Sequence, residues 1–230
     1  MSLACAQCPV RDRAACAVLD ETERGELGRI GRMVDLAPGE VLFRAGDEAP
    51  ACATLVEGAL KIVDTTAEGF EHILGLIHPA GFVGEFFQPF ARHEVVALTR
   101  SRLCVFGGHD MERAIERYPA LARALLRRAQ TDVLASRDLL SLTSSPSAKR
   151  KVAGLLLAFA DAASDSPCHP AAAFDLPLSR GEMAAMLGLT IETVSRRITA
   201  MERDGILSRT GKRGIALHDP ARLSGLAERS

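Results

Sequence analysis

Three of the six cysteines of this 230-residue chain lie together near its amino terminus. Cys5 and Cys8 are separated by two residues, and Cys16 follows after seven more. No basic segment with a following apolar run precedes them, so secretion is not indicated and structural disulfides are not expected. Thiols clustered in this way are typical of metal ligands or redox groups.

A metal centre held by thiolates needs a fourth ligand, and Cys104 is the candidate, in the strand-like segment 101–106. Four thiolates suit an iron-sulfur cluster, but they suit structural zinc as well, and redox thiols without metal are a third reading. A thioredoxin-like pair is disfavoured because no βαβ pattern surrounds the CxxC sequence. The basic side chains of Arg11 and Arg13 could favour ionised sulfurs.

The remaining cysteines and the six histidines show no ligand spacing. Cys52 lies in an apolar strand context, so we expect it to be a small buried side chain. Cys168, which lies between Pro167 and His169 in a loop-like stretch, is expected to be incidental.

A second set of residues suited to recognition lies in segment 178–197, which reads as two short helices hinged at Gly188. Ser179 and Glu182 have the spacing of a capping box, and Thr190 can cap the second helix. This pattern predicts a helix-turn-helix, whose second helix enters the major groove of DNA. The outward side chains of that helix are those of Glu192, Thr193, Ser195, Arg196 and Arg197.

Two strand-like segments, 206–209 and 215–217, follow this pair and flank a basic turn. They predict a winged motif in which Lys212 and Arg213 contact the phosphate backbone. Residues 146–230 carry 12 Lys and Arg against 9 Asp and Glu, whereas the whole chain has a formal net charge of −1. This weak, local excess of positive charge favours sequence-specific duplex binding over coating of a polyanion.

Between about residues 35 and 108, short apolar segments alternate with turn signals every eight to twelve residues. This spacing predicts an antiparallel sandwich or roll. A helical stretch follows from about 110 to 142, broken at Pro119, and a Ser-Ser-Pro-Ser hinge ends it. No stretch is long and apolar enough to span a membrane.

The long helix carries a heptad seam, so we expect it to pair with the same helix of a second copy. Leu121, Leu125, Leu134 and Leu139 are then expected to pack on the roll from neighbouring faces; the alternative is that the seam itself packs there. The seam residues are Ala122, Leu126, Ala129, Val133, Ser136, Leu140 and Thr143.

This order of elements resembles the Crp/Fnr family of transcription regulators over nearly the whole chain, most clearly in segments 41–48, 57–61, 81–85 and 187–196. The resemblance implies an α+β fold: an N-terminal antiparallel β-roll of the cyclic-nucleotide-binding type, a long dimerisation helix and a C-terminal winged helix-turn-helix. The expected divisions are a cysteine-rich segment 1–19, a sensory roll 20–108, a dimerisation helix 109–144 and a DNA-binding domain 146–230.

The recognition helix is similar to that of the Fnr branch, whose Glu, Ser and Arg read a TTGAT half-site. The resemblance thus implies that Glu192 accepts a hydrogen bond from a cytosine amino group, that Arg196 pairs with a guanine and that Ser195 contacts a neighbouring base. The implied partners are double-stranded DNA with a TTGAT-N4-ATCAA palindrome, RNA polymerase and a second copy of the chain in a homodimer. A cytoplasmic regulator without enzymatic activity is expected.

The cysteine pattern resembles that of the oxygen-sensing Fnr proteins, which hold a 4Fe-4S cluster with three N-terminal cysteines and one in this strand of the roll. The resemblance implies the ligands Cys5, Cys8, Cys16 and Cys104, and a cluster that ties the N-terminal segment to the roll until oxygen destroys it. The spacing from Cys8 to Cys16 differs from that of the Fnr proteins with the shortest spacing. It resembles that of a subgroup of cluster sensors with a longer loop.

The chain departs from the cyclic-nucleotide-binding members of the family. Gly84-Glu85 is present, but Phe86, Phe87 and Pro89 follow it where a phosphate cradle needs small residues and free N–H groups. Cyclic AMP is therefore the second choice of effector. A cupin-like catalytic barrel is disfavoured because the roll has no set of His and Glu ligands.

Overall fold

The computed structural model of the chain describes residues 5–48, 51–66, 71–164 and 169–228. The chain folds into two compact units, residues 1–136 and residues 137–230, which are described separately. Within the described residues, no helix is both long and apolar enough to cross a membrane.

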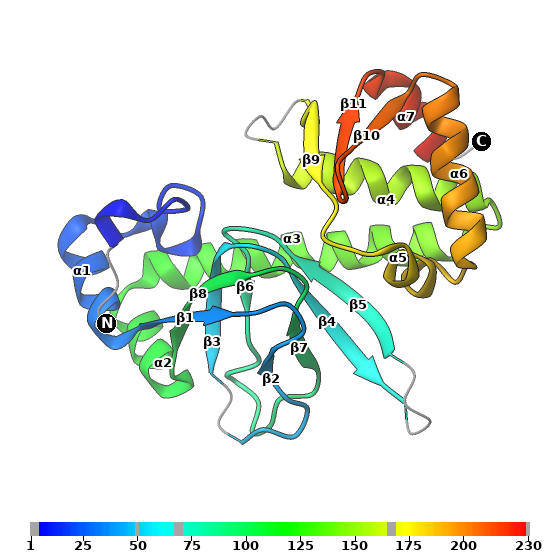
Figure 1. Ribbon diagram of the computed structural model, residues 1–230. Coiled ribbons are helices and arrows are strands. Elements are labelled where there is room, and N and C mark those ends of the chain that lie inside the picture. Colours follow the sequence, from blue (N-terminus) through cyan, green and yellow to red (C-terminus); the bar gives the residue numbers. More distant parts are fainter. Residues whose placement is uncertain (1–4, 49–50, 67–70, 165–168, 229–230) are drawn as a thin grey trace. The chain divides into compact units, whose positions relative to one another are not determined.

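The first unit contains a β-roll of two four-stranded sheets in which the paired strands are antiparallel (Figure 1). The strand order is β1-β8-β3-β6 in one sheet and β2-β7-β4-β5 in the other. Leu55, Leu60 and Leu103 are fully buried in the core of the roll, which confirms the predicted roll. The strands are β1 (Arg32–Leu36), β2 (Val41–Phe43), β3 (Cys52–Glu57), β4 (Leu60–Thr65), β5 (Glu71–Ile77), β6 (Phe82–Val83), β7 (Glu94–Ala97) and β8 (Ser101–Phe106).

Helices flank the roll in the sequence: α1 (Glu21–Ile30) precedes it, and α2 (Gly108–Arg117) and α3 (Pro119–Thr143) follow it. Pro119 is the first residue of α3, where its missing N–H is not needed, so the predicted break is confirmed. Near the start of α3, Leu121 is buried and Leu125 is partly buried in a cluster with Phe106 of β8.

The expected seam of α3 is exposed in the single chain. Leu126, Val133 and Leu140 are 72%, 48% and 66% exposed. Leu134 was expected to pack on the roll but is 51% exposed, because the apolar contacts of α3 with the roll come from its first turns. The helix therefore presents an unpaired apolar stripe.

The described residues of the second unit contain the end of α3, the helices α4 to α7 and a small sheet of order β10-β11-β9. Helix α4 packs against α6 and α7 through an apolar face that includes the buried Val152, Leu156 and Phe159. The elements are α4 (Ala148–Ala162), β9 (Ala173–Asp175), α5 (Arg180–Leu187), α6 (Ile191–Arg203), β10 (Leu207–Thr210), β11 (Gly214–Leu217) and α7 (Pro220–Ala227). The predicted winged helix-turn-helix is confirmed, with β9 as an additional strand on its wing.

Candidate functional site

The amino-terminal cysteine segment lies on the roll through apolar side chains. It contains two short 3-10 helices, η1 (Cys5–Gln7) and η2 (Ala15–Val18). Between them Val10 and Ala14 are 1% and 4% exposed, in a cluster with Val56 of β3. Burial of these two side chains therefore holds the segment on the roll.

The four predicted ligands are brought together by this packing. Cys5, Cys8, Cys16 and Cys104 all line one cavity of about 540 Å³ in the first unit. Cys104 lies on β8 opposite Met33 of β1, and its Sγ donates to the Met33 Sδ at 3.6 Å. The cavity is lined by both apolar side chains, such as Val10, Phe82 and Leu121, and charged ones, among them Arg24 and Asp35.

The four thiols also affect one another electrostatically. Burial raises the pKa of the Cys104 thiol to about 12, and repulsion from Cys8, Cys5 and Cys16 adds to the increase. Burial, and then repulsion from Cys8, raises the pKa of Cys5 and of Cys16 as well. Four thiolates in this space therefore need a cationic group between them, and its binding would release protons.

Four cysteine donors suit two kinds of metal group, structural zinc and a four-iron cluster. Within the described residues, no three His, Cys, Asp or Glu side chains form a group that could hold a metal ion. Tetrahedral zinc with Zn–S bonds of about 2.3 Å requires sulfurs about 3.8 Å apart around a single ion. In a four-iron cluster each thiolate binds a different iron, so the ligands need not converge on one point. Four cysteines around one cavity fit such a cluster in donor type and number.

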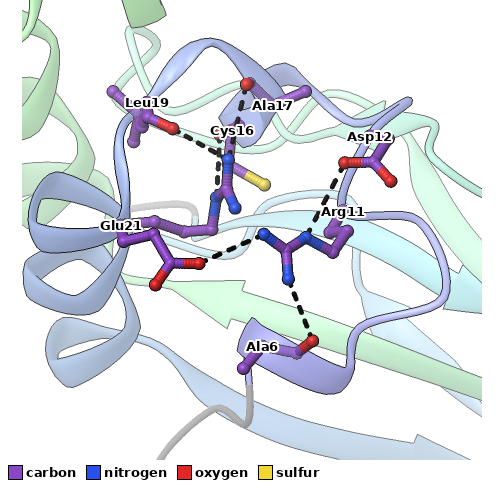
Figure 2. A network of polar contacts seen from close by, with 8 residues as sticks. Ala6, Arg11, Asp12, Cys16, Ala17, Leu19 and Glu21 are labelled. Carbon is purple, nitrogen blue, oxygen red and sulfur yellow. Dashed lines mark hydrogen bonds and ion pairs between the residues drawn. The ribbon is translucent and has the colours of Figure 1, made fainter.

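The basic groups near the cysteines have different contacts. Arg11 donates to the carbonyl of Ala6 at 3.1 Å and forms ion pairs with Glu21 at 3.3 Å and Asp12 at 3.7 Å (Figure 2). Arg24 lies among the cysteines along the cavity, and its charge partly offsets the effect of burial on the pKa of Cys5 and Cys16. No motif or spacing in the sequence singles out Arg24.

The other two cysteines are separate from this set. Cys52 is fully buried in a cluster with Phe106 and Met111, and burial raises the pKa of its thiol to about 12. This agrees with the expected buried hydrophobic residue. Cys168 lies outside the described residues.

The loop after β6 is closed by its own side chains. The Glu85 carboxylate accepts from the backbone N–H of Arg92 at 2.7 Å and lies 2.8 Å from the Nδ1 of His93. Phe86 lies against Phe87, with 4.3 Å between the ring centroids. Each oxygen of the Glu85 carboxylate therefore already has a partner within this loop.

The helix-turn-helix has the predicted local contacts. The Ser179 hydroxyl accepts from the Glu182 N–H at 3.2 Å, and the Glu182 carboxylate accepts from the Ser179 N–H at 2.7 Å. Gly188 has a left-handed backbone with φ of 60°, and the Thr190 hydroxyl accepts from the Thr193 N–H at 3.2 Å. Buried Val194, Ile198 and Met201 hold α6 against the rest of the unit.

The predicted reading residues of α6 differ in exposure. Glu192 and Arg196 are exposed, and Thr193, Ser195 and Arg197 are half-buried. The N–H of Glu192 itself and the Thr190 side chain hold the pKa of the Glu192 carboxyl below its usual value. Glu192 is thus an ionised acceptor at neutral pH, which is the form that a cytosine amino group requires.

The basic residues of the wing are not equivalent. Lys212 is exposed in the turn between β10 and β11, beside Gly211 with φ of 63°. Arg213 donates to the carbonyl of Pro177 at 2.9 Å, and Arg209 pairs with Glu202 at 2.7 Å. Lys212 is therefore the wing residue best placed for a phosphate contact.

Comparisons with known proteins match both halves of the chain. Residues 33–118 match the cyclic nucleotide-binding domain family, and residues 150–226 match the Crp-like helix-turn-helix domain family. The chain is 34% identical to the transcriptional activator protein FnrL of Cereibacter sphaeroides, over 95% of this chain and 90% of that protein. It is 33% identical to the nitrogen fixation regulation protein FixK of Bradyrhizobium diazoefficiens, over 97% and 93%.

A solved structure shows the same fold. The structure of FixK2 from Bradyrhizobium japonicum superimposes with a TM-score of 0.77, covering 87% of this chain and 99% of that one at 24% identity. The fold, with a roll, a long helix and a winged helix-turn-helix in this order along the chain, is therefore shared with a known protein.

Proposed function

The chain belongs to the Crp/Fnr family of transcription regulators, and from this premise we propose that it responds to oxygen through a 4Fe-4S cluster. The ligands are Cys5, Cys8, Cys16 and Cys104. The observation that carries the proposal is that these four cysteines, from two distant parts of the chain, line one cavity.

The cysteines would join two elements that lie far apart in the sequence. When bound, the cluster supplies an oxygen-labile link between the three N-terminal thiolates and Cys104 of β8. Val10 and Ala14 already hold the segment on the roll, on the side where Cys104 lies. Loss of the link leaves the segment held by these apolar contacts alone.

The cavity also touches the dimerisation helix. Leu121 and Leu125 of α3 line it together with the cysteines, and Met111 of α2 lies beside them. A change in what the cavity holds therefore acts directly on the first turns of α3.

Pairing of α3 with its copy is the proposed response to this change. The exposed Leu126 and Val133 supply apolar area for a homodimer, while the exposed Ser136 weakens the seam. An interface with such a weak point can be shifted between states by a few kcal/mol.

A homodimer presents two copies of α6 to one palindrome. Glu192, Ser195 and Arg196 would read each half of TTGAT-N4-ATCAA, Thr193 and Arg197 would support them from the same helix, and Lys212 would contact phosphate. Such a regulator acts in the cytoplasm, and as an activator it would recruit RNA polymerase. The sequence-based divisions at 1–19, 20–108, 109–144 and 146–230 remain our domain assignment.

A DNA-binding titration under nitrogen and in air tests this function. We expect tight binding of the palindromic duplex under nitrogen, and weakening by at least one order of magnitude after exposure to air. Cys104→Ser should bind weakly in both conditions, because it lacks one ligand. Cys52→Ala is the matched control and should keep the response; equal affinity of the wild-type protein in both gases would contradict the proposal.

A further inference from the structure

Arg24 of α1 is a buried arginine whose hydrogen bonds go to backbone carbonyls. The residue is 9% exposed. Its Nη2 donates to the carbonyl of Leu19 at 2.8 Å and to that of Ala17 at 3.4 Å, and its Nε donates to that of Cys16 at 3.4 Å. The guanidinium thus spans the turn that carries the third cysteine.

Nearby carboxylates are engaged elsewhere. Asp20 and Glu23 form the capping box of α1, with hydrogen bonds of 2.8 and 3.0 Å, and Glu21 pairs with Arg11. Among the described residues, Arg24 forms no ion pair with a carboxylate. A buried cation compensated only by carbonyl dipoles is costly to maintain, so its position calls for an explanation.

The position of Arg24 beside the cysteines supplies that explanation. Arg24 lines the same cavity as Cys5, Cys8, Cys16 and Cys104. A group held by four thiolates carries net negative charge, and a fixed cation at its edge would stabilise it.

We infer that Arg24 is a positioning residue for the cysteine site: its fork fixes the turn of Cys16, and its charge faces the thiolates. Only the second part of this inference, the role of the charge beside the thiolates, rests on the proposed function. The fixed turn is a property of the protein without metal. Arginine suits the role because its planar, permanently charged fork reaches several carbonyls at once, whereas lysine supplies a single point of charge.

Amide hydrogen exchange of the metal-free protein tests the first half. Arg24→Met and Arg24→Lys should both raise the exchange rates of the Ala17 and Leu19 amides about tenfold, because both lose the charged hydrogen bonds to this turn. The amides of β3 and β8 should be unchanged. The matched control is Arg11→Met, which removes a half-buried arginine of the same segment that does not contact the Cys16 turn, and it should leave both rates unchanged.

Two results would overturn this part. Unchanged exchange at Ala17 and Leu19 in Arg24→Met would show that the fork does not fix the turn. Equal loss of protection across the whole roll would show that Arg24 serves general stability rather than the cysteine segment.

Cluster retention tests the second half. After reconstitution with iron and sulfide without air, Arg24→Met should lose its visible absorbance in air several-fold faster than Arg24→Lys, which keeps the charge. Equal rates would refute a role for the charge. If the wild-type protein takes up no cluster, the proposed function fails. The exchange measurement then still tests whether Arg24 fixes the turn of Cys16.

Discussion

The cysteine site and the DNA-reading site are built by the chain in different ways. The four cysteines meet only because the N-terminal segment packs on β8 and its neighbours, a contact between residues far apart in the sequence. The ends of the helix-turn-helix are shaped by contacts within a few residues, such as those of Ser179 with Glu182 and of Thr190 with Thr193. The first site therefore depends on tertiary packing that a signal can alter, and the second keeps its local geometry.

The two sites also differ in burial. The cysteine side chains are half-buried beside a cavity, whereas Glu192, Arg196 and Lys212 are exposed. Changes at the first site should alter the state of the protein, and changes at the second should alter its affinity for DNA. Each substitution below tests this separation.

The largest expected effect comes from paired core substitutions, one in each unit. Leu187 of α5 and Leu103 of β8 are both fully buried. Each change to alanine should lower the free energy of unfolding of its own unit by about 2–5 kcal/mol, measured by urea denaturation. Only Leu103→Ala should also reduce iron uptake, because β8 carries Cys104. Equal loss of iron in Leu187→Ala would contradict the separation of the cysteine site from the DNA-reading site.

A smaller effect is expected on the seam of α3. Ser136→Leu should favour a homodimer that no longer depends on oxygen, because burial of one leucine contributes about 1.5–3 kcal/mol per copy. Sedimentation of the metal-free protein measures the change, and Ala135→Leu, one position off the seam, is the control. A wild-type protein that forms the same tight dimer with and without cluster would rule out a switch in assembly.

The reading helix should show an effect of similar or smaller size. Arg196→Ala should cost about 1–3 kcal/mol of binding free energy and relax the preference at a single G·C pair. The measurement is a titration on the palindrome and on duplexes with that pair replaced. Equal losses on all duplexes would make Arg196 a phosphate contact instead.

The smallest effect is expected at the wing. Lys212→Ala should weaken binding by a similar factor on every sequence and lower the slope of affinity against salt by about one unit. Arg213→Ala should change that slope less, because the Arg213 side chain is held by the Pro177 carbonyl. A larger change of slope in Arg213→Ala than in Lys212→Ala would reverse this assignment of the wing.

The sequence predicted best the features that local hydrogen bonds control. The capping box at Ser179, the left-handed Gly188 and the cap at Thr190 follow from residue type within a few positions, and the structure confirms all three. The roll and the break at Pro119 were predicted for the same reason, because turn residues and proline act locally.

Features that depend on distant contacts were missed. The role of Arg24 is invisible in the sequence, since an arginine in a polar helix is normally exposed. Strand β9 is three residues long and has no periodicity of its own, so only its pairing with β11 reveals it. Helical spacing alone predicts that Leu134 packs on the roll, but it is 51% exposed. The spacing does not show at which turn a helix stops packing on a neighbouring element.

The metal content of protein purified without air tests the central claim most directly. We predict a coloured protein with about four iron and four acid-labile sulfide per chain, both lost together on exposure to air. A colourless anaerobic preparation that contains stoichiometric zinc and no sulfide would contradict the cluster, and with it the proposed response to oxygen.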